Sequence, residues 1–174
     1  MPTGPKPPLT PLATALRMLA RRPYSVAEMR RALERKFGSG GPVEAAIARL
    51  REVGYLDDKK FAALYASSLA RNRNLGRHRV RRELKSKLVD YRTIEPALDA
   101  AFAEVDEQAL LERAVARKVQ SIRRPVTPAR IHSLVQSLMR RGFRADDIMK
   151  AVRARPELKP VAEDVVPDEE NSEL

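Results

Sequence analysis

The sequence repeats an apolar pattern about every 50 residues. A shift of 54 positions pairs Leu84 with Leu138 and Ile94 with Ile148. A third copy lies upstream, where Leu33 stands at the position of Leu84 and the following loop is four residues longer. Repeats of this length are typical of stacked helical units, each of which buries an apolar face against its neighbours. The pattern therefore favours a surface that binds something long over a pocket that holds something small.

The composition favours a helical protein, and the absence of cysteine fits a reducing compartment. Ala, Leu, Arg, Lys and Glu dominate, Trp is absent and only 5% of residues are aromatic. With no cysteine, the chain has neither disulfides nor thiolate metal sites. It has no apolar run of about 18 residues, and its first 11 residues lack the apolar core of a secretory signal. We expect a cytoplasmic protein with no membrane partner.

Start and stop signals predict nine helices in three sets of three. Capping residues are expected before five of the helices, at Thr10, Ser25, Asp57, Asp106 and Thr127. The predicted helices cover about 11–22, 26–37, 42–53, 58–73, 77–88, a segment starting near 93, 107–122, 128–141 and 145–154. The apolar faces of the first and fourth helices are expected to carry Leu12, Leu16, Leu19, Phe61, Leu64, Tyr65 and Leu69.

Pro96 constrains where the sixth helix begins. It would break a hydrogen bond inside a helix, so we expect it in the first turn of a helix that begins near Thr93. The predicted organisation is all-α, with three tandem three-helix repeats that resemble helix-turn-helix units and form a long solenoid. The expected bounds are a disordered tail over 1–9, repeats over 10–56, 57–104 and 105–156, and a disordered acidic tail over 157–174.

The charge is unevenly distributed along the chain. The formal net charge is +11, yet residues 161–174 hold six acids and no base. Residues 1–160 therefore carry 34 bases against 17 acids, an excess of 17. Such an excess indicates an anionic partner, which is nucleic acid, an acidic protein surface or both. The acidic tail is expected to be solvated; the alternative is a tail that folds back and competes with the anionic partner.

Nothing in the sequence predicts catalysis or a cofactor. The two histidines, His78 and His132, fall in different repeats, and no glycine-rich phosphate-binding loop is present. The acidic pairs Asp57-Asp58 and Asp146-Asp147 stand where helices begin, so we expect them to cap backbone N–H groups rather than to bind a metal. We predict a protein that is not an enzyme and has no metal or cofactor.

A dense group of cations marks the middle repeat. Its members are Arg71, Arg73, Arg77, Arg79, Arg81, Arg82, Lys85 and Lys87. Only Glu83 offsets them, and Arg77, Arg81 and Lys85 are spaced to form one ridge of a helix. We predict that this basic stretch binds an anionic partner. The alternative is a solvated face whose long side chains cover apolar surface.

Sequence-specific reading of duplex DNA is disfavoured. The helix that would enter the major groove carries Glu95, Asp99 and Glu104, which DNA would repel. Stacking on single-stranded bases is also disfavoured, because Phe61, Tyr65 and Phe143 have core-like positions. We therefore expect non-specific binding to single- or double-stranded DNA.

Residues 12–156 resemble the RecX family, bacterial regulators of the RecA recombinase. The matching segments are ALRMLARRPYSVAEMRRAL (15–33), VGYLDDKKFAALYASSLARNRNLGRHRVRREL (53–84) and LMRRGF (138–143). The middle segment is the most specific. The family usually places Gly after its Leu-x-x-Lys in this repeat, whereas Leu88 stands there in this sequence.

The resemblance implies a curved, basic array that binds in the groove of the RecA–DNA filament. It implies that binding dampens the recombinase, ATPase and co-protease activities of RecA. We expect the protein to be a monomer. The alternatives are a DNA-binding protein with no recombinase partner and a helical adaptor whose charge serves solubility. The sequence leaves open which repeat contacts RecA and which DNA, whether the protein caps or coats filaments, and whether it inhibits or stimulates.

Overall fold

The structure is a computed structural model that describes residues 9–122 and 125–159. In these ranges the chain forms nine α-helices, one short 3-10 helix and no strand. The helices are α1 Pro11–Leu19, α2 Val26–Phe37, α3 Gly41–Glu52, α4 Asp58–Arg73, α5 Arg77–Ser86, α6 Tyr91–Ala103, α7 Glu107–Gln120, α8 Pro128–Arg140 and α9 Ala145–Arg153, followed by a 3-10 helix over Pro156–Leu158. The all-helical fold class predicted from the sequence is confirmed.

Each set of three helices encloses its own apolar core. We call α1–α3 repeat 1, α4–α6 repeat 2 and α7–α9 repeat 3. Their fully buried side chains include Met29, Leu33, Ile47 and Leu50 in repeat 1, Val80, Leu84, Ile94 and Leu98 in repeat 2, and Leu111, Val115, Leu138 and Ile148 in repeat 3. The positions related by the 54-residue shift thus occupy equivalent places in repeats 2 and 3.

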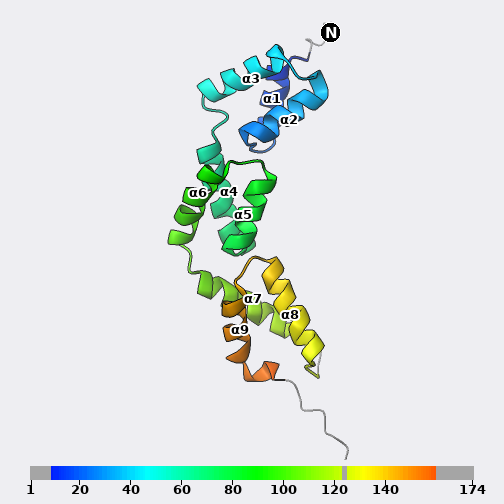
Figure 1. The fold of residues 1–174 in the computed structure, drawn as a ribbon, viewed down its shortest axis with the longest axis vertical. Helices are drawn as coiled ribbons and strands as arrows, with labels where there is room; N and C mark the ends of the chain where they lie inside the picture. Colours follow the sequence, from blue (N-terminus) through cyan, green and yellow to red (C-terminus); the bar gives the residue numbers. More distant parts are fainter. Residues whose placement is uncertain (1–8, 123–124, 160–174) are drawn as a thin grey trace, which may run out of the picture.

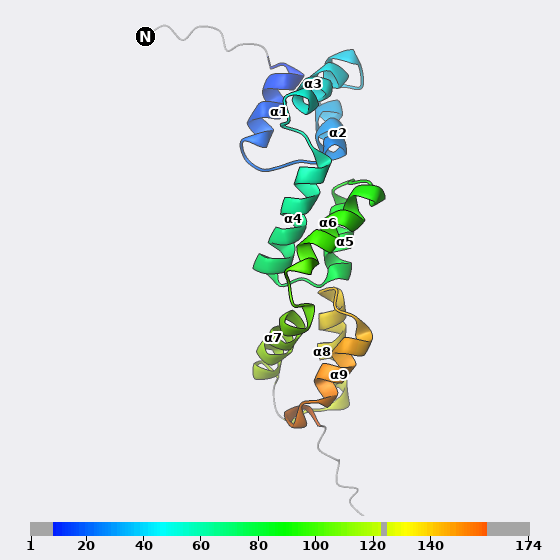
Figure 2. The same cartoon turned by 90° about the vertical axis from the view of Figure 1, so that its left-hand side faces the viewer.

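The three repeats are placed end to end along one long axis (Figures 1 and 2). Repeat 1 lies at one end, repeat 2 in the middle and repeat 3 at the other end, and in Figure 1 they follow a shallow arc. Helices pack chiefly on partners of the same repeat, as α4 and α5 do on α6. A body of this shape offers a long surface to a partner.

The predicted caps are confirmed. The side chains of Thr10, Ser25, Asp57, Asp106 and Thr127 each accept a hydrogen bond from a backbone N–H in the first turn of the following helix. These bonds satisfy donors that have no partner within the helix, so they fix where the helix begins.

Four expected helix boundaries differ from the structure by two or three residues. α5 ends at Ser86 rather than at 88, and α7 ends at Gln120 rather than near Ile122. α1 ends at Leu19, before the predicted Arg22. α6 begins at Tyr91 rather than near Thr93, because Asp90 accepts a hydrogen bond from the backbone N–H of Arg92 at 2.8 Å and caps the helix earlier. Pro96 consequently lies inside α6, beyond the first turn.

Two predicted core residues point outward. Leu16 is 42% exposed and Leu64 is 73% exposed. In α1 the predicted residues Leu12 and Leu19 do pack against the core, and Ala15, with the nearly buried Thr14, takes the place expected for Leu16. In α4 the small residues Ala62 and Ala66 join Phe61 and Leu69 in the core, and they allow α6 to pack closely.

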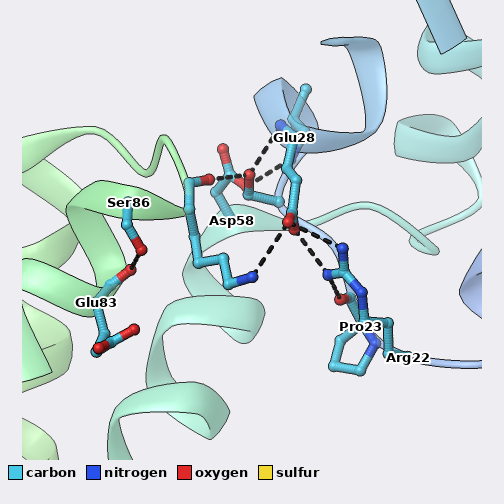
Figure 3. Close-up of polar contacts among 9 residues, drawn as sticks. Arg22, Pro23, Glu28, Asp58, Glu83 and Ser86 are labelled. Carbon is cyan, nitrogen blue, oxygen red and sulfur yellow. Dashed lines mark hydrogen bonds and ion pairs between the residues drawn. The ribbon is translucent and has the colours of Figure 1, made fainter. Parts of the chain in front are cut away.

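The joint between repeats 1 and 2 is built from polar groups at the start of α2 (Figure 3). Ser25 donates its hydroxyl proton to the carbonyl oxygen of Lys87, and the N–H of Val26 donates to Oδ1 of Asp58 at 2.8 Å. Glu28 lies between Arg22 and Lys87: Arg22 contacts both carboxylate oxygens at 2.9 Å, and Nζ of Lys87 lies 3.2 Å from Oε1. The predicted capping residue Ser25 therefore also ties the two repeats together.

The joint between repeats 2 and 3 joins the start of α5 to the end of α8. The N–H of Gly76 donates to the carbonyl of Arg141 at 2.9 Å, and the N–H of His78 donates to the carbonyl of Gly142 at 3.3 Å. In return, the guanidinium of Arg141 donates to the carbonyl oxygens of Arg73 at 2.9 Å and Asn74 at 3.2 Å. Backbone groups left open by each helix end are thus satisfied by the other repeat.

The third core extends further than predicted. Leu158 is buried in the core of repeat 3, two residues past the expected end of the repeat at Pro156. The expectations for residues 1–8 and for the acidic segment 160–174 lie outside the described residues.

Candidate nucleic-acid interface

Two of the eight predicted cations lie at the end of α4, five lie on α5, and Lys87 follows the last residue of α5. Four of them form ion pairs inside repeat 2 and one pairs with repeat 1. The pairs are Arg71–Glu104, Arg77–Asp99, Arg79–Glu83, Arg81–Glu95 and Lys87–Glu28. Three of the five acids belong to the end of repeat 2, on or just after α6. The acidic residues that disfavour duplex reading are therefore the counterions of the basic stretch.

The pair between Arg81 and Glu95 is held by two hydrogen bonds. Nε and Nη2 of Arg81 contact the two carboxylate oxygens of Glu95 at 2.7 and 2.8 Å, and both side chains are half-buried. This two-point hydrogen bond lowers the pKa of Glu95 and raises the pKa of Arg81. Arg77 and Arg81 of the predicted ridge are thus directed at α6, where their charge holds two helices together.

The other three cations have no carboxylate partner among the described residues. Arg73 is exposed at the end of α4. Arg82 is exposed and donates to the carbonyl oxygen of Arg140 at 3.2 Å. Nζ of Lys85 lies 5.9 Å from the centre of the Tyr91 ring. Their charge is therefore less compensated than that of the paired five.

The excess of positive charge differs among the repeats. Residues 10–56 hold nine bases and four acids, residues 57–104 hold 11 and seven, and residues 105–159 hold 13 and six. Repeat 2, with its dense run of arginines, thus has the smallest net excess. The largest excess, +7, lies in the segment of repeat 3. A run of bases in the sequence shows where positive charges are dense. The acids that pack against them determine the net charge that the surface presents to a partner.

Several residues of the joints were not singled out from the sequence. Asp58 binds the backbone of Val26 across the first joint, although we expected it to cap its own helix. Arg141 is directed into the second joint, where burial lowers the pKa of its guanidinium, with a further contribution from the charge of Arg117. Two parts of the family resemblance could have indicated this joint, because both the LMRRGF segment and Gly76 lie there.

The acidic pairs have structural roles. Asp57 caps α4, whereas Asp147 pairs with Arg144 at 3.9 Å and makes no capping hydrogen bond to α9. Among the described residues, no group of three or more His, Asp or Glu side chains could hold a metal ion. The described part of the chain also contains no helix with the length and apolar character needed to cross a bilayer.

Profiles of known families match two of the three repeats. Residues 12–50 match the first three-helix domain of RecX, and residues 57–98 match the second. "Regulatory protein RecX" of Thermobifida fusca is 32% identical over 158 residues, which cover 91% of this chain and 85% of the relative. The protein of the same name from Thermus thermophilus is 38% identical over 102 residues, covering 59% and 69% of the two chains.

Solved structures agree in fold. A crystal structure of RecX from Lactobacillus salivarius aligns with a TM-score of 0.67 at 18% identity and covers 83% of this chain and 93% of that one. Another crystal structure of regulatory protein RecX aligns with a TM-score of 0.70 at 20% identity, covering 81% and 70%. Together with the sequence matches, these similarities establish that the chain belongs to the RecX family of regulatory proteins, which are not enzymes.

Proposed function

We propose that this protein regulates the RecA recombinase, mainly as an inhibitor, by binding in the groove of the RecA–DNA filament. Membership of the RecX family supports a regulatory role. The observation that carries the proposal is the end-to-end placement of three separately cored repeats, each with an excess of bases. A long, basic body matches a long, anionic groove better than it matches a compact ligand.

The proposed mechanism is steric and electrostatic. A filament groove displays DNA phosphates and acidic protein surface at regular intervals, so successive repeats would contact successive protomers. A molecule seated there blocks the incoming duplex and hinders the subunit movements that ATP hydrolysis and co-protease activity require. The protein would act as a monomer in the cytoplasm, where RecA and the chromosome are found.

The proposed contacts include the eight cations of repeat 2, in unequal roles. Arg73, Arg82 and Lys85 have no carboxylate partner among the described residues and would bind phosphates directly. The five paired cations would contribute less, because moving a guanidinium from a carboxylate to a phosphate exchanges one ion pair for another. Their larger contribution is to fix α5 against α6 and repeat 2 against repeat 1.

A RecA assay tests this proposal. RecA-filament ATPase and strand exchange are measured with rising concentrations of the protein at several salt concentrations. We expect both activities to fall, and the inhibition to weaken steeply as salt rises, because phosphate contacts depend on counterion release. Unchanged ATPase and strand exchange at stoichiometries that coat the filament would rule the proposal out.

A further inference from the structure

A second basic surface lies in repeat 3, in a groove between α7 and α8. The groove has a volume of about 380 Å³. Its polar lining consists of three cations and three serines: Lys118, Arg130, Arg140, Ser121, Ser133 and Ser137. No carboxylate is among the described residues that line it. This contrasts with repeat 2, where carboxylates neutralise most of the arginines.

Two of the cations are available for a ligand. Lys118 is half-buried and Arg140 is exposed, and neither side chain has an ion-pair or hydrogen-bond partner in the described part of the chain. Arg130 is anchored at the other end of the groove by a hydrogen bond to the carbonyl of Pro125. Bringing like charges together in a groove raises the local positive potential and attracts anions.

The hydroxyl groups point to the kind of anion. Ser133, Ser137 and Arg140 are spaced four and three residues apart on α8, so they share one face of the helix. This row spans about 10 Å, at a rise of 1.5 Å per residue. A DNA strand advances about 3.4 Å per nucleotide, so the row matches a stretch of roughly three nucleotides. Phosphate oxygens accept hydrogen bonds from arginine, lysine and serine alike.

The lining of the groove also includes two apolar residues. Ile122 and Leu134 are the apolar residues of its lining, and both pack in or against the core of repeat 3. Apolar surface beside hydrogen-bond donors suits the sugar of a nucleotide, which has few polar groups, when the donors bind its phosphates. An acidic peptide offers charged carboxylates but no regular alternation of anionic and apolar groups.

One end of the groove lies next to the basic stretch of repeat 2. Arg82 of α5 donates to the main-chain carbonyl of Arg140, whose side chain lines the groove. Figure 1 shows the end of α8 facing α5 across the second joint. An uncompensated cation of repeat 2 therefore lies beside the residue whose side chain lines the groove of repeat 3.

We infer that the α7–α8 groove is a binding site for the sugar–phosphate backbone of DNA, with Lys118 and Arg140 as its main phosphate contacts and Ser133 and Ser137 as hydrogen-bond donors. The inference rests on the proposed function only for the identity of the ligand. It assigns the strongest DNA contact to repeat 3 and not to the run of arginines in repeat 2.

The test compares two double variants of the full chain that lose the same charge from the same repeat. Lys118→Gln with Arg140→Gln alters the groove, whereas Lys150→Gln with Arg153→Gln alters exposed positions on α9 outside it. Binding of a labelled 20-nucleotide oligo-dT is measured by fluorescence anisotropy between 50 and 300 mM salt, without RecA. Circular dichroism and thermal unfolding verify that both variants fold.

The groove variant should bind about tenfold more weakly, and the slope of its salt dependence should fall by about 1.4, which corresponds to two lost phosphate contacts on single-stranded DNA. The α9 variant should lose less than about threefold. Equal losses in the two variants would overturn the inference, as would a groove variant that binds like the wild type. The inference would also be overturned if the groove variant lost at least as much affinity for poly-glutamate as for oligo-dT, because the groove would then be a site for acidic peptides.

Failure of this inference is distinguishable from failure of the proposed function. If the wild type leaves RecA unaffected but the groove variant loses oligo-dT binding, the DNA site stands and regulation of RecA is wrong. If RecA is inhibited while the two double variants bind DNA equally, regulation stands and the groove is not the site.

Discussion

Gly76 and Gly142 lie in close contact across the joint between repeats 2 and 3. A Cβ atom added to Gly76 would lie 2.5 Å from the carbonyl oxygen of Gly142, far inside van der Waals contact. Gly76 has an ordinary φ of −74°, so its backbone alone would accept any residue. The close approach of the two repeats is therefore what requires glycine at this position.

Gly76→Ala should weaken this joint. The backbone must shift to admit the methyl group, which we expect to cost about 1–3 kcal/mol of stability. Hydrogen exchange should accelerate at residues 76–79 and 141–143, where the backbone hydrogen bonds between the repeats lie. Gly41→Ala is the control, because nothing lies within 4 Å of a Cβ there. Unchanged exchange in Gly76→Ala would contradict the described joint.

Leu88→Gly should stabilise the protein. Leu88 has φ +59°, in the left-handed region that costs a residue with a side chain about 1 kcal/mol or more, and its side chain is 43% exposed. Glycine removes that strain but adds freedom to the unfolded chain, so the net gain should be about 0.5 kcal/mol in urea unfolding. Leu88→Ala keeps the strained backbone and should give no gain. A destabilised glycine variant would show that the side chain matters more than the backbone strain.

Glu28→Gln should destabilise the first joint in a pH-dependent way. Burial opposes the ionisation of Glu28, but hydrogen bonds from Arg22 and Lys87 outweigh it and lower its pKa below the usual 4.5. A lowered folded-state pKa means that the carboxylate stabilises the fold above about pH 4.5 and that this contribution is lost as the pH falls through the lowered pKa.

At pH 7 the variant should lose about 1–2 kcal/mol in urea unfolding, because Glu28 is largely buried between two cations. The difference from the wild type should shrink progressively below pH 4.5. Glu44→Gln, which removes a more exposed ion pair with Arg30, should lose less than about 0.5 kcal/mol. A pH-independent effect of Glu28→Gln would show that the ion pairs do not stabilise the joint.

Asp99→Asn should strengthen DNA binding. Asp99 is the ion-pair partner of Arg77, and its removal leaves that guanidinium available to phosphate. We expect a gain of about two- to threefold in oligo-dT affinity at low salt. Glu34→Gln removes one negative charge in repeat 1 from a side chain with no ion pair among the described residues. Equal gains in the two variants would mean that only net charge matters and that Arg77 does not reach the DNA.

Local signals in the sequence were sufficient for most of the fold. The caps Ser25, Asp57 and Asp106 bond to backbone within three residues of themselves, so the chain around each cap already determines them. The apolar register was equally readable, because Leu84 and Leu138 repeat with the helical period in both repeats. Helix faces lined by small residues were harder to predict, because Ala15 and Ala62 are less apolar than the neighbouring Leu16 and Leu64.

The charge of the candidate site could not be read from the sequence in the same way. Arg81 and Glu95 are 14 residues apart and meet only because α5 packs on α6. Lys118 and Arg140 looked unremarkable, because they are scattered along two helices and only their packing brings them to one groove. The density of bases along the chain identified a basic protein, but it did not show that acids pair with five of the eight cations of repeat 2 or that the segment of repeat 3 has the largest excess of bases.

The most direct measurement compares the affinity of this protein for RecA filaments assembled on oligo-dT with its affinity for the same DNA alone, at the same salt concentration. A regulator that binds in the filament groove contacts both protein and DNA, so we expect tighter binding to the filament, by at least about tenfold. Equal or weaker binding to the filament would contradict the account and would identify a DNA-binding protein with no recombinase partner.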